Sequence, residues 1–140
     1  MYLNYVAPYK LEKANSTDAG FDLRSTETVE FEPGDVRVVS TGCSLQRDYD
    51  HLGRFKHIEI HLRGRSSLAV KGFITHFGTI DETYNSEIKV VMAYFGKEKY
   101  TINKNDKIAQ LVFCYLSPVE LTAVEHIDPN RGGFGSSGVQ

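Results

Sequence analysis

The 140-residue sequence contains no tryptophan, two cysteines, two methionines and four prolines. Cys43 and Cys114 have neither CxxC spacing nor a companion set of metal ligands, so we expect reduced thiols. No apolar run approaches the roughly 20 residues that a membrane-spanning helix needs, and the N-terminus shows no basic segment followed by an apolar one. We therefore expect no membrane span and a cytoplasmic location, or a nuclear one if the host is eukaryotic or viral.

An excess of charge of one sign is also missing. Sixteen Lys and Arg residues stand against 18 Asp and Glu residues, for a formal net charge of −2. This balance gives no broad basic surface for a polyanion, so direct nucleic-acid binding is not expected. The 41% hydrophobic residues and the chain length suit one domain that buries about 68% of the surface of its unfolded chain.

The hydrophobic pattern has a period of two. Residues 57–63 alternate strictly between polar and apolar, which is typical of a strand with one wet face. Residues 87–95 and 107–116 are rich in branched and aromatic side chains on both faces, as are strands buried between two layers. Residues 28–32 and 36–40 flank a Pro-Gly-Asp turn and predict a hairpin or two successive strands. Many short strands separated by turns indicate an all-β sandwich or barrel.

One short helix is predicted after residue 65. Ser66 or Ser67 can cap the first turn of residues 68–71, and Gly72 stands where a left-handed C-terminal cap is expected. The start of a helix exposes unpaired N–H groups and a partial positive charge. The guanidinium of Arg65 and the two serine hydroxyls add donors suited to phosphate oxygens. The alternative is that the serines only cap the helix and Arg65 pairs with a carboxylate.

The C-terminal residues 130–140 differ in composition from residues 1–129, since they are rich in Gly and Ser. Glycines let a backbone approach a ligand closely, and Arg131 adds a permanent charge. The alternative is a solvated end of the chain. Phe134 favours docking, because a lone aromatic side chain in a polar arm has little reason to be there unless it docks. Stacking one base on an aromatic ring contributes about 1–3 kcal/mol. We predict a single domain over residues 1–129 and a flexible arm that clamps a nucleotide.

Four further polar residues lie in or beside apolar segments. Asp81 and Tyr84 fall in a loop or hairpin that Ile80 holds to the core, and Asp22 and Gln110 interrupt apolar segments. The structural alternative for Asp81 and Tyr84 is a turn aspartate beside a packed tyrosine, and the alternative for Gln110 is an amide bonded to the backbone. The histidines of residues 57–63 lie on the polar face of a strand without further zinc ligands, so a metal site is not expected there.

Five segments in register carry a resemblance. They are Ala19-Gly20-Phe21-Asp22-Leu23, Arg65-Ser66-Ser67-Leu68-Ala69, Gly78-Thr79-Ile80-Asp81-Glu82-Thr83-Tyr84, Asp106-Lys107-Ile108-Ala109-Gln110-Leu111 and Gly132-Gly133-Phe134-Gly135-Ser136-Ser137-Gly138. Together they cover nearly the whole chain and resemble the trimeric deoxyuridine triphosphatase (dUTPase) family. The resemblance implies an all-β jelly-roll or β-clip barrel, assembled as a homotrimer with active sites at subunit interfaces and an arm that closes over a neighbour's site.

The resemblance also implies an activity, the Mg²⁺-assisted hydrolysis of dUTP to dUMP and pyrophosphate. This reaction keeps uracil out of DNA and supplies dUMP for dTMP synthesis. Asp81 would be the catalytic residue that activates water for attack on the α-phosphorus, and Asp22 would bind the metal through water. The residues expected to bind substrate are Arg65, Ser66, Ser67 and Gln110 at the phosphates, Tyr84 under the deoxyribose, the backbone around Thr79, Ile80 and Lys89 at uracil, and Arg131, Phe134 and Gly135 from the arm.

Two alternatives stay open. The dCTP deaminases share the fold, but they use a glutamate at the position that aligns with Val91, and they commonly carry a tryptophan where Tyr84 stands. The second alternative is a trimeric binding protein on the same scaffold that sequesters a regulatory protein partner.

Overall fold

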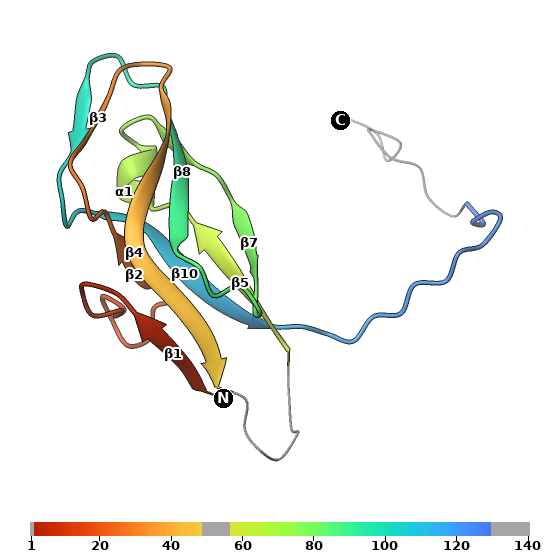
Figure 1. The fold of residues 1–140 in the computed structure, drawn as a ribbon. Helices are drawn as coiled ribbons and strands as arrows, with labels where there is room; N and C mark the ends of the chain where they lie inside the picture. Colours follow the sequence, from red (N-terminus) through yellow and green to blue (C-terminus); the bar gives the residue numbers. More distant parts are fainter. Residues whose placement is uncertain (1, 49–56, 130–140) are drawn as a thin grey trace.

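The computed structural model describes residues 2–48 and 57–129, which form an almost entirely β structure with one short helix. The elements are β1 (Tyr2–Val6), β2 (Phe21–Arg24), β3 (Val29–Phe31), β4 (Val36–Asp48), β5 (Ile58–Arg63), α1 (Ser66–Ala69), β6 (Phe73–Thr75), β7 (Gly78–Asp81), β8 (Ile88–Tyr94), β9 (Tyr100–Ile102) and β10 (Lys107–Tyr115). The prediction of an all-β chain is confirmed (Figure 1).

The strands form two four-stranded antiparallel sheets, in the orders β1-β4-β8-β6 and β2-β10-β5-β7, and a small pair, β3-β9. One buried cluster takes side chains from both larger sheets, among them Val39, Val90 and Met92 from the first and Ile60 and Leu111 from the second. The two sheets therefore pack face to face around one hydrophobic core, as in a jelly roll.

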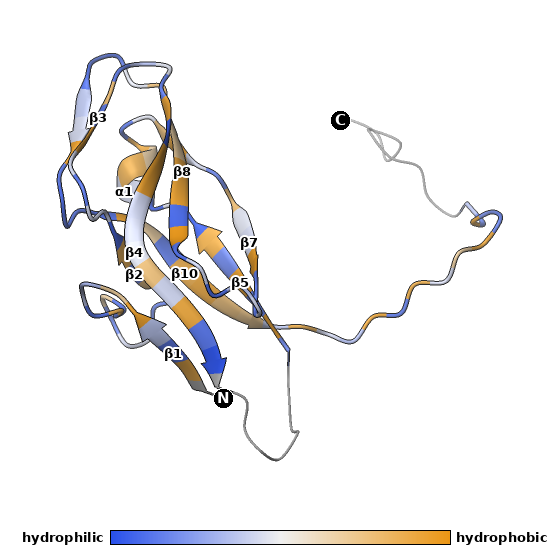
Figure 2. Cartoon of the chain, viewed as in Figure 1, coloured by the Kyte–Doolittle hydropathy of each residue, from blue (hydrophilic) through white to orange (hydrophobic). Residues whose placement is uncertain are grey.

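The alternation of apolar and polar residues in the sequence matches the alternation of buried and exposed side chains in the strands. In β5, Ile58, Ile60 and Leu62 are buried, while the alternate residues are partly or fully exposed, as predicted. The prediction that β8 is buried on both faces is wrong for the single chain. Its residues 88, 90, 92 and 94 are buried, but Val91 and Ala93 on the other face remain partly exposed. Most of the length of β8 is coloured as hydrophobic in Figure 2. Among the described residues, no second layer covers that apolar face.

The Pro-Gly-Asp turn separates two successive strands, one of the two predicted outcomes. β3 pairs with β9, whereas β4 pairs with β1 and β8. With 13 residues, β4 is much longer than the predicted segment 36–40.

The short helix is present, but the predicted serine cap is wrong. Arg65, with extended backbone, is the N-cap residue, and no side chain caps the helix. Ser66 and Ser67 lie inside the first turn with exposed side chains. Gly72 follows the helix with φ at +99°, as predicted for the C-terminal side, and a Cβ there would lie 2.7 Å from the nitrogen of Gly96.

After β10 the chain leaves the body of the molecule in an extended conformation (Figure 1). This segment, residues 116–129, carries apolar side chains that are 50–94% exposed, namely Leu116, Val119, Leu121, Val124 and Ile127. In the described residues, no helix has the length and apolarity to cross a membrane. The predicted arm, residues 130–140, lies outside the described residues.

Candidate active site: a polar pocket and an apolar slot

A polar pocket of about 370 Å³ gathers five of the predicted residues. Its lining is Ala14, Asp18, Ala19, Gly20, Asp22, Arg65, Ser66, Ser67 and Gln110. These residues come from three stretches that are far apart in the sequence. The fold therefore brings Asp22, Arg65, Ser66, Ser67 and Gln110 to one concave surface.

The register of the second sheet explains why they meet. β10 lies between β2 and β5, so Gln110 faces Asp22 on one side and Arg63 on the other. The chain then passes from Arg63 through Gly64 into α1, which carries Arg65 and the serines to the same end of the sheet. Strand pairing thus sets the position of every polar group in this pocket.

Asp22 is a buried carboxylate held between two cations. Its Oδ1 lies 3.3 Å from Nε of Arg65, and its Oδ2 lies 2.8 Å from Nζ of Lys107. Nη1 of Arg65 also donates to the backbone oxygen of Lys107 at 3.2 Å. Because a buried charge without a partner is costly, these pairs stabilise the carboxylate. Arg65 therefore pairs with a carboxylate, as the structural alternative held, and it also lines the pocket.

Gln110 is fixed by its neighbours as well. Its Nε2 donates to the carbonyl of Gly64 at 3.0 Å, which matches the backbone-bonded alternative. A Cβ on Gly20 would lie only 2.2 Å from Oε1 of Gln110. Residue 20 must therefore be glycine for the amide to keep this place. Sequence reasoning assigned no role to Gly20 or Lys107, although both lie in the segments that carry the resemblance.

A second, smaller cavity of about 140 Å³ lies between β7 and the beginning of β8. We call it the slot, and its lining is Leu62, His76, Gly78, Ile80, Tyr84, Ile88, Lys89 and Val91. It contains the predicted residues Ile80, Tyr84 and Lys89 and shares no lining residue with the polar pocket. Its volume is well below the roughly 300–1,000 Å³ of a cleft that encloses a whole ligand.

The two strands beside the slot belong to different sheets. β7 pairs with β5, and β8 pairs along its length with β4. On the other side of β8, pairing with β6 covers only Met92 to Tyr94, and His76 donates to the carbonyl of Val91. In the described residues, the facing edges of β7 and the first part of β8 thus carry backbone N–H and C=O groups without a strand partner.

The loop between these strands is fixed at both ends. Tyr84 donates its hydroxyl to the carbonyl of Glu87 at 2.8 Å, and its N–H donates to the carbonyl of Asp81 at 3.0 Å. The Glu87 carboxylate accepts hydrogen bonds from the Ser40 hydroxyl and from the N–H of Gly42. These bonds lower the pKa of Glu87. The ring of Tyr84, 45% exposed, therefore stands on a rigid turn.

Asp81 is the last residue of β7 and lies opposite Glu59 of β5. Strand alternation places its side chain, with that of Thr79, on the face opposite to Ile80, and neither lines the pocket or the slot. Within residues 2–48 and 57–129, the exposed Asp81 carboxylate makes no hydrogen bond or ion pair. The predicted residues Arg131, Phe134 and Gly135 lie outside the described residues.

A cluster that sequence reasoning missed adjoins Asp81. Glu82 is bound by Arg47, by the N–H of Ile58 and by the ring of His57. His57 is among the histidines expected on the polar face of a strand, and its side chain is 67% exposed. No local pattern signals this cluster, because Arg47 and Glu82 are 35 residues apart.

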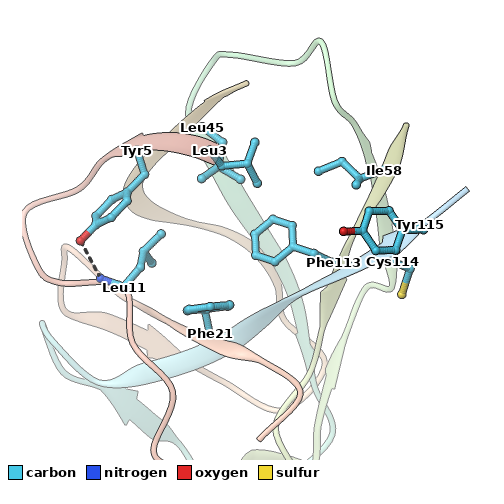
Figure 3. Close-up of a pocket in the computed structure, with 9 residues that line it drawn as sticks. All are labelled: Leu3, Tyr5, Leu11, Phe21, Leu45, Ile58, Phe113, Cys114 and Tyr115. Carbon is cyan, nitrogen blue, oxygen red and sulfur yellow. Dashed lines mark hydrogen bonds between the residues drawn. The ribbon is translucent and has the colours of Figure 1, made fainter. Parts of the chain in front are cut away.

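A third cavity is apolar and contains none of the predicted residues. Its volume is about 430 Å³, and Figure 3 shows its lining. Leu3 and Tyr5 of β1 lie across it from the Phe113 ring of β10, and the Tyr5 hydroxyl accepts a hydrogen bond from the N–H of Leu11 at 3.4 Å. It is an unfilled gap at the edge of the core rather than a polar site.

The described residues contain no group of three or more His, Cys, Asp or Glu side chains that could enclose a metal ion. The carboxylates at the polar pocket are Asp18 and Asp22. Its cationic and hydroxyl groups suit an anion, and the free backbone edges of the slot suit a flat polar ring. Fold and site thus define a class, small all-β proteins with a polar pocket that suits an anion and a separate apolar slot.

Comparison with known proteins makes this class specific. The dUTPase family model matches residues 10–138, so the chain belongs to the dUTPase family. The deoxyuridine 5'-triphosphate nucleotidohydrolase of Solibacter usitatus is 40% identical over 126 residues, which cover 86% of this chain and 81% of that protein.

Solved structures agree with the fold. The dUTPase of Staphylococcus bacteriophage 80alpha with dUPNHPP, described in connection with control of the transfer of virulence genes, is 25% identical, covers 99% of each chain and has a TM-score of 0.81. A mutant dUTPase from phage phi11 of S. aureus, described with a structural Mg(II) ion, is 22% identical, covers 92% of this chain and 100% of that one, and has a TM-score of 0.75.

Proposed function

We propose that this protein hydrolyses dUTP to dUMP and pyrophosphate, with the triphosphate in the polar pocket and the uridine in the slot. Membership of the dUTPase family supports the reaction. The single observation that carries the assignment of parts is the lining of the two cavities, one polar with a guanidinium and two hydroxyls, the other apolar with free backbone edges.

The polar pocket supplies charge and donors to the phosphates. Arg65 has donors beyond those that bind Asp22 and Lys107, and a guanidinium fork matches phosphate oxygens. The hydroxyls of Ser66 and Ser67 are not engaged in capping the helix, so they can donate to the same oxygens. Gln110 is already oriented by Gly64 and Gly20. Such preorganised donors act without reorganisation at the moment of reaction.

The slot selects the base and the sugar. The backbone edges at Thr79, Ile80 and Lys89 offer uracil donors and acceptors in fixed positions, and cytosine reverses one of each. Sites that leave polar groups unpaired with the wrong ligand discriminate by about 10⁴–10⁵. The rigid ring of Tyr84 stacks under the deoxyribose and leaves no space for a 2′-hydroxyl.

Asp81 acts on water. Its carboxylate accepts the proton of the water as the water oxygen bonds to the α-phosphorus, and the bond from that phosphorus to the bridging oxygen of pyrophosphate breaks. The exposed carboxylate, without partners in the described residues, is able to take this role. Phosphoryl transfer needs mainly positioning and charge stabilisation from a protein, and a placed general base contributes about 10²–10⁴-fold.

The residues of the polar pocket fit a Mg²⁺ ion that takes most of its ligands from phosphate and water. Mg²⁺ in phosphate sites is usually held by one or two carboxylates and keeps several waters. Asp22 suits indirect contact with the ion through water, because both of its carboxylate oxygens already lie against the cations Arg65 and Lys107. When bound, the ion neutralises charge on the phosphates.

We further propose that the active protein is a homotrimer in which the two cavities of a site come from different copies. The pocket and the slot share no lining residue. Residues 116–129 extend away from the body with exposed apolar side chains, and the body of each copy carries the apolar cavity of Figure 3. The arm, residues 130–140, then closes over a neighbour's site through Arg131, Phe134 and Gly135.

The deaminase alternative is disfavoured by Val91, which lines the slot without a group able to move a proton. The regulatory alternative is compatible with catalysis, and we propose it only as a second role. Binding of a protein partner that survives Asp81→Asn would separate it from dUTP hydrolysis.

A panel of nucleoside triphosphates tests the proposal. The protein is incubated with dUTP, UTP, dCTP and dTTP in the presence of Mg²⁺, and pyrophosphate and ammonia are measured. We expect dUTP to release pyrophosphate much faster than the other three nucleotides, and ammonia to be released from none. Ammonia from dCTP, or equal pyrophosphate release from dUTP and dTTP, would contradict the proposal.

A further inference from the structure

Glu82 follows Asp81 directly, where β7 ends, and its carboxylate is held by groups from two other parts of the chain. Oε2 accepts hydrogen bonds from Nη1 of Arg47 and, at 3.1 Å, from the N–H of Ile58. Oε1 lies 2.6 Å from Nδ1 of His57. Arg47 belongs to β4 of one sheet, and Ile58 begins β5 of the other. One side chain therefore joins the end of β7 to both sheets.

The Arg47–Glu82 pair is largely removed from water. The side chains are 2% and 13% exposed, respectively. Burial opposes the charged form of Glu82, but the hydrogen bonds from His57 and Ile58 and the charge of Arg47 outweigh it, so the pKa of Glu82 is lowered. Charge-assisted bonds of this kind are strong and demanding in geometry, so they fix the position of the backbone that carries them.

Asp81 has no comparable support of its own. Its side chain makes no bond within the described residues, so its direction depends on the backbone at the end of β7. That strand has a partner on one side, β5, and its pairing ends at Asp81 opposite Glu59. The end of such an edge strand opens easily unless something beyond it is held. Glu82 is the next residue along the chain.

We propose that Glu82 is a positioning residue for Asp81. Through Arg47 and Ile58, its carboxylate fixes the end of β7 and thereby the direction in which the Asp81 carboxylate points. His57, which is mostly exposed, assists by its hydrogen bond. The inference rests on the proposed role of Asp81 in hydrolysis. It adds to that role a residue that lines neither cavity.

The experiment measures kcat per binding site in Glu82→Gln, which keeps the shape of the side chain and removes its charge. Sites are counted by titration with the α,β-imido analogue of dUTP, so unfolded protein does not enter the rate. We expect kcat per site to fall about 10- to 100-fold, because small misplacements of reacting groups carry penalties of this size. KM should change less than about threefold, since both cavities keep their lining.

A matched control separates positioning from simple destabilisation. Ile102→Val shortens a fully buried side chain on β9 that lines neither cavity. It should lower the Tm and leave kcat per site unchanged. Arg47→Lys, which keeps the charge and loses the planar fork, provides a second variant if Glu82→Gln does not fold, and its kcat per site should fall less than that of Glu82→Gln would.

A double-mutant comparison decides the route of the effect. If Glu82 acts through Asp81, then Glu82→Gln in the Asp81→Asn background should lower the rate no further. An unchanged kcat per site in Glu82→Gln, or in Arg47→Lys if the first variant does not fold, would overturn the inference, as would full additivity with Asp81→Asn. A wild-type protein that releases no pyrophosphate from dUTP would instead overturn the proposed function, and this inference with it.

Discussion

The polar pocket and the slot differ in the source of their polar groups. The pocket takes its chemistry from side chains, with Asp22 between Arg65 and Lys107 and two serine hydroxyls beside them. The slot takes its polar groups from the backbone edges of β7 and β8 and surrounds them with apolar side chains such as Ile80 and Val91. Both depend on strand pairing, which places the polar side chains of the pocket and the backbone edges of the slot.

This difference teaches where affinity and selectivity reside. Charged side chains interact with any triphosphate, because the phosphates of all nucleotides are alike. Backbone groups in a rigid slot recognise the pattern of donors and acceptors on one base, and shape excludes the wrong sugar. Changes in the pocket should therefore affect all substrates equally, and changes in the slot should affect the preference among them.

The largest effect is expected at Asp81, which lines neither cavity but carries the proposed chemistry. Asp81→Asn keeps the shape of the side chain and removes the group that takes the proton, so kcat should fall by about 10²–10⁴-fold. Binding of the imido analogue of dUTP, measured by calorimetry, should stay within a few fold of wild type. A near-normal rate of pyrophosphate release would remove Asp81 from its role.

Arg65→Ala tests the pocket. It removes a charge-assisted donor, an interaction that contributes about 1.5–3 kcal/mol, so kcat/KM for dUTP should fall roughly 10- to 150-fold. The measurement is steady-state kinetics with dUTP and UTP. The ratio of the two kcat/KM values should stay constant, and a large change in that ratio would break the division between pocket and slot.

Tyr84→Ala tests the slot. Without the ring, the space under the sugar opens, and the preference for dUTP over UTP should drop by at least about 10-fold. Tyr84→Phe keeps the ring and loses the hydrogen bond to Glu87, so it should cost about 0.5–1.5 kcal/mol of stability and leave the preference intact. Equal preferences in all three proteins would rule out sugar stacking.

The smallest effect concerns the acidic groups that support the slot. The pKa values of Glu82 and Glu87 are lowered in the folded state. Between the folded pKa and the unfolded value of 4.5, the unfolded chain binds more protons, so stability is complete above about pH 4.5 and is lost as the pH falls below it. Thermal unfolding between pH 7 and pH 3.5 should show a steeper loss for wild type than for Glu87→Gln. Parallel curves would contradict this contribution.

Much of the fold is readable from local pattern. The alternation of residues 57–63 predicts β5 and its buried face, since burial in a strand follows the parity of the sequence. Asp22, Arg65, Ser66, Ser67 and Gln110 are predicted through a resemblance, and β pairing brings them together. The arm residues and every assigned chemical role stay predictions.

The remainder depends on contacts without a local signal. The Arg47–Glu82 pair joins two sheets across 35 residues, and no spacing in the sequence announces it. The serine cap failed because the helix begins one residue earlier than the cap pattern suggests, as the chain leaves β5. The sequence predicts that β8 is buried on both faces because apolar residues stand on both. One of these faces is partly exposed because no layer covers it among the described residues of the single chain.

Subunit complementation tests most directly the claim that pocket and slot are halves of one site supplied by different copies. Arg65→Ala chains, impaired in the pocket, are mixed and reassembled with Asp81→Asn chains, impaired beside the slot, and pyrophosphate release from dUTP is measured. We predict that mixed assemblies regain a substantial part of wild-type activity, because some sites then combine two intact halves. Mixed assemblies that form, as confirmed by a tag on one chain, and yet stay as inactive as the two parents would contradict the account.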